Sequence, residues 1–185
     1  MEYFDILNPD GTKTGQIKQR ELVHRDGDLH AAVHIFIMRK TPAGYDVLLQ
    51  KRSRHKDSFP GRLDTSSAGH LSAGDDFVTG AVRECKEELG LDISPLELQF
   101  LFDLRIDGET TFYNKPFKNH ELVRVYRLLR DVNIQDLTLQ QEEIESVCWM
   151  DMTLARQKLQ ARDGDLCIYP REYEQLYHMF YPDAH

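Results

Sequence analysis

Three glutamates in the middle of the chain have a spacing that matches one turn of a helix. Glu84, Glu87 and Glu88 stand at positions i, i+3 and i+4, so a helix would present all three carboxylates on one face. Like charges at this spacing repel by roughly 0.2–0.5 kcal/mol per pair. Hard oxygen ligands gathered in this way suit a divalent cation such as Mg²⁺. The pattern therefore predicts a metal site.

The alternative is a solvated acidic face, which is the usual meaning of a run of charges. The carboxylates alone slightly favour that alternative. The glycines around them, together with Arg83 directly before Glu84, shift the balance toward a metal site.

A glycine-containing loop leads into the helix that must carry these glutamates. Asp75 and Asp76 follow Gly74 and place negative charge where a helix N-terminus favours it. Gly90 stands where a left-handed C-terminal cap belongs. The apolar stripe between these ends comprises Phe77, Val78, Ala81, Val82, Cys85 and Leu89.

Residues 69–91, GHLSAGDDFVTGAVRECKEELGL, resemble the Nudix box. That motif reads Gly, five residues, Glu, seven residues, Arg-Glu-apolar-any-Glu-Glu-any-Gly-apolar. The one departure is Asp75, which replaces the first Glu. The matching positions are Gly69, Arg83, Glu84, Cys85, Glu87, Glu88, Gly90 and Leu91.

The resemblance implies a Mg²⁺- or Mn²⁺-dependent hydrolase that cleaves a pyrophosphate bond in a nucleoside diphosphate-linked or other diphosphate substrate. It implies that Arg83, Glu84 and Glu88 are the catalytic residues, with Glu84 acting as base or orienting water and Arg83 holding the glutamates. The implied metal ligands are Glu84, Glu87, Glu88 and the Gly69 carbonyl. An acid outside the box often assists in this family, and the candidates are Glu121 first, then Glu142 and Glu143.

A basic loop precedes the box. Residues 52–68 show little periodicity and are rich in Lys and Arg, so the loop could supply cations for a polyphosphate while the helix holds metal. We expect Lys51, Arg52 and Arg62 to bind substrate. A solvated loop that binds no ligand accounts for each of these basic residues about equally well.

A second resemblance covers residues 50–76, QKRSRHKDSFPGRLDTSSAGHLSAGDD, which are similar to isopentenyl diphosphate isomerase, itself an enzyme of Nudix fold. That enzyme binds metal through three histidines and two glutamates. His24, His30 and His70 would match the histidines, and Glu121 one of the acids. Whether the three histidines form a second metal site here stays open.

Two positions depart from the isomerase pattern. Ala68 stands where the isomerase has its catalytic cysteine, and Asn119 where the other acid is expected. A methyl group cannot transfer a proton, and a carboxamide cannot replace a charged ligand. We therefore expect the isomerase scaffold without its reaction, and keep as alternatives the isomerase itself and a catalytically silent ligand-binding module.

Composition and charge narrow the classes of protein further. The 185 residues are expected to form one domain, with residues 1–29 as an N-terminal extension. The net charge of −8 argues against general nucleic acid binding.

No apolar run reaches membrane-spanning length and no leader pattern is found, so we expect a cytoplasmic protein that does not enter membranes. The three cysteines are an odd number and widely spaced, so we expect them to be free thiols.

The remaining pattern predicts an α+β chain. An N-terminal β-hairpin (strands at residues 3–7 and 14–23) would serve for packing or as a homodimer interface. A turn at Asp107-Gly108 would separate two later strands, and aromatic residues near it, Phe112, Tyr113 and Phe117, could wall a pocket or simply pack. Further strands are expected at 30–38, 45–51, 96–106, 122–129 and 142–150, with helices at 154–161 and 171–180. With the Nudix resemblance, this becomes a mixed β-sheet sandwiched between helices (α/β/α).

Overall fold

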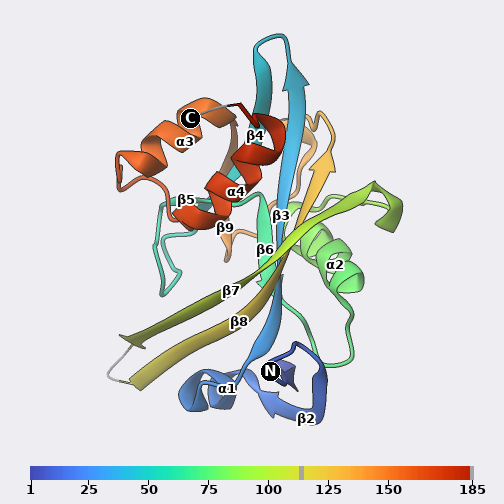
Figure 1. Cartoon of the computed structure of the whole chain (residues 1–185), viewed down its shortest axis with the longest axis vertical. Coiled ribbons are helices and arrows are strands. Elements are labelled where there is room, and N and C mark those ends of the chain that lie inside the picture. The colour runs from blue at the N-terminus through green and yellow to red at the C-terminus, as the bar shows by residue number, and fades with distance from the viewer. Residues whose placement is uncertain (113–114, 184–185) are drawn as a thin grey trace.

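A seven-stranded mixed sheet forms the centre of the computed structural model, which describes residues 1–112 and 115–183 (Figure 1). The strand order is β5-β4-β3-β8-β7, with β6 also paired to β3 and β9 to β4. β3 and β8 are parallel and the other pairs are antiparallel. The strands are β3 (His30–Thr41), β4 (Gly44–Arg52), β5 (Leu63–Asp64), β6 (Ser67–His70), β7 (Leu98–Phe112), β8 (Lys115–Leu129) and β9 (Ile144–Asp151).

Helices cover both faces of this sheet. Helix α2 (Phe77–Leu89) lies on one face, and α3 (Met152–Gln160) and α4 (Pro170–Phe180) lie on the other (Figure 1). Successive side chains of a strand point to opposite faces. β3 therefore supplies Val33 and Ile35 to the core beneath α2, and Phe36 to the core beneath α3 and α4. The expected α+β sheet between helices is confirmed.

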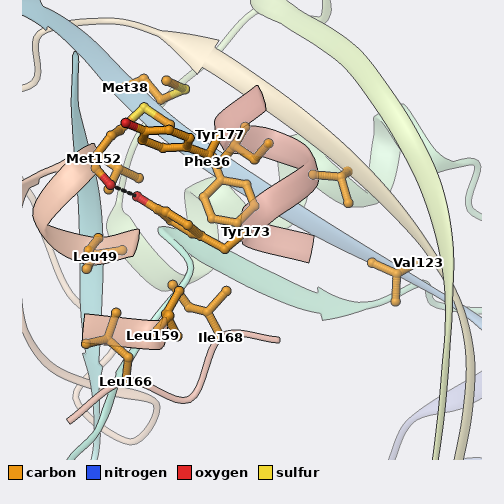
Figure 2. Close-up of a cluster of buried hydrophobic side chains, with 14 of the residues drawn as sticks. Phe36, Met38, Leu49, Val123, Met152, Leu159, Leu166, Ile168, Tyr173 and Tyr177 are labelled. Atoms are coloured by element: carbon orange, nitrogen blue, oxygen red, sulfur yellow. Dashed lines mark hydrogen bonds between the residues drawn. The ribbon is translucent and has the colours of Figure 1, made fainter. Parts of the chain in front are cut away.

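The core on the α3 and α4 side contains aromatic residues. Tyr173 of α4 packs edge-on against Phe36, with ring centroids 6.2 Å apart, and donates a 3.2 Å hydrogen bond from its hydroxyl to the Met152 carbonyl (Figure 2). Burying an aromatic side chain of this size contributes roughly 1.5–3 kcal/mol. This cluster fixes α4 against the sheet.

The N-terminal segment begins as the expected antiparallel hairpin, with β1 (Tyr3–Leu7) and β2 (Lys13–Gln19). The prediction that the second strand continues to residue 23 is wrong. Residues from Arg20 form helix α1 (Arg20–Asp26), which buries Val23 and His24 and ends at Gly27 in the left-handed conformation, φ 77°. The burial of residues at helical spacing outweighs the sequence pattern that predicted a strand here.

The turn predicted at Asp107-Gly108 is also wrong. Both residues lie inside β7, paired with His120 and Asn119 of β8. Gly108 adopts no positive φ and a Cβ there would have free space, so nothing in its environment breaks the strand. The pairing continues to Phe112 and Lys115. Tyr113, one of the aromatics expected near the turn, lies outside the described residues.

All three cysteines are free thiols. Among the helices that the structure describes, none is both long enough and apolar enough to cross a membrane.

Candidate active site

Helix α2 is positioned by both of its ends and by its apolar stripe. The Asp76 carboxylate accepts a 2.7 Å hydrogen bond from the Thr79 backbone N–H, and Gly90 closes the helix with φ 66°. Ala81, Cys85 and Leu89 are fully buried against the sheet. The polar side of the helix therefore faces β6 and solvent.

Arg83 holds two of the three glutamates together. Its Nη1 donates to Glu84 Oε1 at 2.8 Å and to Glu87 Oε2 at 3.0 Å. Its Nη2 donates to the His70 backbone carbonyl at 2.9 Å, so the guanidinium also joins α2 to β6. Asp75 lies 3.3 Å from Arg83 Nε, in the supporting place that the motif gives to its first acid.

Glu88 is the most enclosed of the three carboxylates. Its side chain accepts hydrogen bonds from Ser67 Oγ at 2.7 Å and from the Ala68 N–H at 3.1 Å. Burial raises the pKa of Glu88 to about 8, although the Ser67 hydrogen bond opposes the shift. No Lys, Arg or His pairs with Glu88 in the part of the chain that the structure describes. A buried carboxylate without a cationic partner suits a bound cation.

Gly69 lies directly against Glu84. A Cβ at residue 69 would be 2.2 Å from Glu84 Cδ, which is well inside van der Waals contact. The glycine is thus required for the close approach of the box helix. Gly69 therefore lies against the face of α2 that carries the glutamates, whose oxygens are of the kind that a hard divalent cation prefers.

Glu121 stands in a different place from the other predicted ligands. Its backbone is paired with that of His30 in the β3–β8 register, and its side-chain Oε1 lies 2.9 Å from His70 Nε2. Asn119 Nδ2 donates to its Oε2 at 2.7 Å. Burial alone would raise the pKa of Glu121, but the contact with His70 outweighs it and lowers the pKa to about 2. Glu121 therefore lies beside His30 and His70, and His70 is itself a residue of the box.

His24, His30 and His70 form a compact cluster whose candidate ligand atoms all lie within 4.8 Å of one another. The Nε2 atoms of all three are buried and make no hydrogen bond to the described residues; the 2.9 Å approach of His70 to Glu121 lacks hydrogen-bond geometry. Burial lowers the pKa of His24 to about 3 and that of His30 to about 4. Neutral imidazoles with free nitrogens are metal ligands.

Further contacts orient these rings. Nδ1 of His24 lies 3.3 Å from the Lys118 carbonyl, and Nδ1 of His30 lies 3.0 Å from the Asp28 carbonyl. A hydrogen bond from Nδ1 to a carbonyl leaves the Nε2 lone pair free to bind metal. Phe4 of the N-terminal hairpin stacks on His30 and His70, with centroid distances of 5.3 and 4.8 Å. The hairpin, which was expected only to pack or to form a dimer interface, thus supplies one wall of the cluster through Phe4.

The predicted substrate-binding cations all have partners within the chain. Lys51 Nζ lies 2.9 Å from Glu145, and Arg52 Nη1 lies 2.9 Å from Asp64. The Arg62 guanidinium lies over the Phe59 ring, 5.4 Å from its centroid. A phosphate group would have to compete with Glu145 and Asp64 for the first two.

The two remaining candidate acids differ in position. Glu143 forms an ion pair with Lys56, and its charge contributes to the raised pKa of Glu88, so it lies near the box. Glu142 lines a surface hollow with Ser53, Arg54 and His55.

A mixed sheet between helices, with a glycine loop leading into a helix that carries three glutamates at one-turn spacing, is the arrangement of a NUDIX domain. The family model for the NUDIX domain matches residues 28–171, and the chain belongs to this family.

Its relatives are Nudix hydrolases. The chain is similar to "Nudix hydrolase 3" of Arabidopsis thaliana, at 41% identity over 88% of this chain, but it spans only 21% of that protein's length. It is 30% identical to "Uncharacterized Nudix hydrolase lin0387" of Listeria innocua, over 87% of this chain and 84% of that protein. The crystal structure of DR0079 from Deinococcus radiodurans shares the fold, with a TM-score of 0.73 and 21% identity over 95% of this chain and 99% of that one.

One close pair at the sheet was missed by the sequence analysis. His34 of β3 and Glu172 of α4 are in contact, with Nδ1 and Oε1 2.7 Å apart. The available signal was a histidine at a core-facing position of an otherwise apolar strand. Its partner, 138 residues away, carried no signal.

Proposed function

We propose that the protein is a Mg²⁺- or Mn²⁺-dependent hydrolase that cleaves the pyrophosphate bond of a small diphosphate substrate, such as a nucleoside diphosphate linked to another group. The observation that carries this proposal is that α2 carries Glu84, Glu87 and Glu88 at the spacing of one helix face, with Glu84 packed against Gly69. Glu88 in particular is buried without a cationic partner among the described residues. Burying a carboxylate without a cation costs folding free energy, and a bound metal ion would offset that cost.

In this proposal Glu84, Glu87, Glu88 and the Gly69 carbonyl hold the metal. A divalent ion there would screen the phosphate charge and make water a better nucleophile. Glu84 orients or deprotonates the attacking water. Arg83 keeps Glu84 and Glu87 in place through the hydrogen bonds described above.

Lys51, Arg52 and Arg62 bind the phosphates in this proposal. Arg52 and Arg62 border the same short segment, because the Arg52 N–H donates to the Arg62 carbonyl at 2.9 Å. Arg52 and Lys51 must exchange their present carboxylate partners for phosphate oxygens. Guanidinium groups suit this exchange since they bind phosphate bidentately.

The three histidines and Glu121 form a second metal site in this proposal. Three buried imidazole nitrogens that make no hydrogen bond to any described residue support it. Imidazole nitrogen ligands favour Zn²⁺ over the harder Mg²⁺.

The histidine cluster also favours a second candidate function, an isomerase acting on a prenyl diphosphate. Ala68 speaks against it, because a methyl group offers no proton at the position where that resemblance requires a thiol. Incubation with isopentenyl diphosphate distinguishes the two reactions: a dimethylallyl product indicates the isomerase, and release of phosphate indicates the hydrolase.

The experiment that tests the hydrolase is a screen of diphosphate substrates with Mg²⁺ and Mn²⁺, repeated with Glu88→Gln. The substrates are nucleoside diphosphate sugars, dinucleoside polyphosphates, NADH, capped nucleotides and prenyl diphosphates. The matched control is Glu109→Gln, at an exposed position of β7. We expect metal-dependent hydrolysis of at least one substrate, lost in Glu88→Gln and kept in the control. Full activity of Glu88→Gln would refute the assignment.

A further inference from the structure

The loop that joins β6 to α2 connects the two parts of the proposed metal site. β6 ends at His70, one residue after the proposed Gly69 ligand, and α2 begins at Phe77. Between them run residues 71–76, the box loop, which bends at Gly74 with φ 95°, in the left-handed region. The conformation of the box loop therefore determines where the carboxylates of α2 lie relative to the Gly69 carbonyl.

Two backbone N–H groups of the box loop donate to the N-terminal hairpin, which lies below this loop in Figure 1. The Ala73 N–H donates to the Tyr3 carbonyl at 2.8 Å, and the Gly74 N–H donates to Asp5 Oδ2 at 2.8 Å. The first contact is independent of side-chain identity, whereas the second requires an acceptor at residue 5. A carboxylate accepts a stronger hydrogen bond than a neutral group does. Asp5 is thus the side chain of β1 that holds the box loop.

Lys13, on the second strand of the hairpin, adds a contact to the next residue of the loop. Its Nζ donates to the Asp75 carbonyl at 3.0 Å. The same Nζ lies 2.7 Å from Asp5 Oδ2, the oxygen that also accepts from Gly74. Burial alone would raise the pKa of Asp5, but the hydrogen bonds from Lys13 and Gly74 outweigh it and lower the pKa. Asp5 is therefore ionised at neutral pH, and with Lys13 it holds Gly74 and Asp75 together.

The box loop is connected to the glutamates through the side chain of Asp75. Asp75 Oδ2 lies 3.3 Å from Arg83 Nε. The same guanidinium donates to Glu84 at 2.8 Å and to Glu87 at 3.0 Å. Lys13 thus fixes the backbone of the residue whose side chain orients Arg83. A shift of the loop would move the group that orients two of the proposed metal ligands.

Packing of the hairpin alone does not account for Asp5. The hairpin packs through Phe4, which stacks on His30 and His70, and successive side chains of a strand point to opposite sides. Asp5 therefore points away from the histidines, toward the box loop. Its side chain is 15% exposed and that of Lys13 is 47% exposed. An ion pair with a half-exposed partner contributes little to stability, so a role in positioning the loop better explains the carboxylate.

We propose that Asp5 is a positioning residue for the metal site: it holds the box loop at Gly74 and, together with Lys13, keeps Arg83 and the glutamates of α2 in the arrangement that binds Mg²⁺. This inference rests on the proposed hydrolase function. Asp5 contacts neither metal nor substrate and acts through the loop. The NUDIX family model matches residues 28–171, so the hairpin adds this contact from outside the matched part of the chain.

The test measures metal affinity and folding separately. Isothermal titration calorimetry with Mg²⁺ alone compares the wild-type protein with Asp5→Ala, which should bind Mg²⁺ about tenfold more weakly, as for loss of an outer contact to metal ligands. The matched control is Glu2→Ala, which removes a hairpin carboxylate that pairs with Arg20 instead of the box loop. The control should keep wild-type affinity, and thermal melting should show similar stability for both variants. Wild-type affinity in Asp5→Ala, or an equal loss in Glu2→Ala, would overturn the inference.

Two further variants separate positioning from folding. Asp5→Asn keeps an oxygen that can accept from the Gly74 N–H, so it should recover most of the affinity that Asp5→Ala loses. Equal losses in these two variants would contradict the proposed hydrogen bond. Lys13→Met removes the contact to the Asp75 carbonyl and should also weaken Mg²⁺ binding. Wild-type affinity in Lys13→Met would overturn the inference even if Asp5→Ala does not fold.

Failure of this inference is distinct from failure of the hydrolase proposal. If the wild-type protein binds Mg²⁺ and every hairpin variant binds it equally well, the inference fails and the hydrolase proposal stands. If the wild-type protein binds no Mg²⁺, the proposed metal site fails, and the inference fails with it.

Discussion

Gly69 and Glu84 touch so closely that a methyl group at residue 69 would lie 2.2 Å from the Glu84 carboxyl carbon. This contact couples a strand that begins the motif to the helix that carries the glutamates. Arg83 reinforces the coupling through the His70 carbonyl. The position of Glu84 is therefore set by the backbone of β6.

Gly69→Ala should push Glu84 away from its present place. We expect Mg²⁺ affinity and turnover to fall by about tenfold or more, as for loss of an orienting contact, and the free energy of unfolding to fall by about 1–3 kcal/mol. Gly108→Ala is the control, because a Cβ there meets no atom within 4 Å. Metal titrations and chemical denaturation of both variants check this, and wild-type metal affinity in Gly69→Ala would contradict it.

Mg²⁺ binding should release a proton and strengthen with pH. Burial raises the pKa of Glu88 to about 8 in the metal-free protein, so at neutral pH the carboxyl is largely protonated, whereas the metal requires the carboxylate. Affinity should rise by about tenfold per pH unit below pH 8 and level off above it. Calorimetry in buffers of different ionisation enthalpy counts the released protons. A pH-independent affinity between pH 6 and 8 would show that Glu88 is already ionised.

The His34–Glu172 pair should make the unfolding free energy depend on alkaline pH. The folded-state pKa of His34, about 9, is above its unfolded value near 6.5. The contribution is therefore fully present below about pH 6.5 and is lost as pH rises through 9. It amounts to at most about 3 kcal/mol. Denaturation of wild type and His34→Gln from pH 6 to 10 should show curves that converge at high pH. A constant difference would contradict this account.

The histidine cluster should bind one equivalent of Zn²⁺. The three free Nε2 atoms predict that this ion raises the melting temperature, since it binds the folded state only. His30→Ala should lose the bound equivalent in equilibrium dialysis. His178→Ala, at a half-exposed histidine of α4, should keep it. Unchanged stoichiometry in His30→Ala would exclude the site.

Local sequence patterns predicted the box helix because its caps and its apolar stripe are formed by residues close together in the sequence. The cap at Asp76, the stripe ending at Leu89 and the left-handed Gly90 are encoded within one helix, and the structure contains each of them. The α+β class followed from the same kind of pattern.

What the sequence did not predict depends on long-range packing. Arg20–Asp26 is helical because Val23 and His24 become buried, and strand β7 runs through Asp107-Gly108 because β8 pairs with it. The contact between His34 and Glu172 spans 138 positions. Neither residue has a neighbour in sequence that indicates its partner, so only the assembled sheet and helix bring them together.

The central claim is that the glutamates of α2 bind a divalent ion against a diphosphate. Anomalous diffraction from crystals grown with Mn²⁺ and a methylene-bridged diphosphate tests it most directly. We predict an anomalous peak within coordination distance of Glu84, Glu87 and Glu88, with the diphosphate on its open side. A peak at the histidines alone, with the three carboxylates turned toward solvent, would contradict the claim.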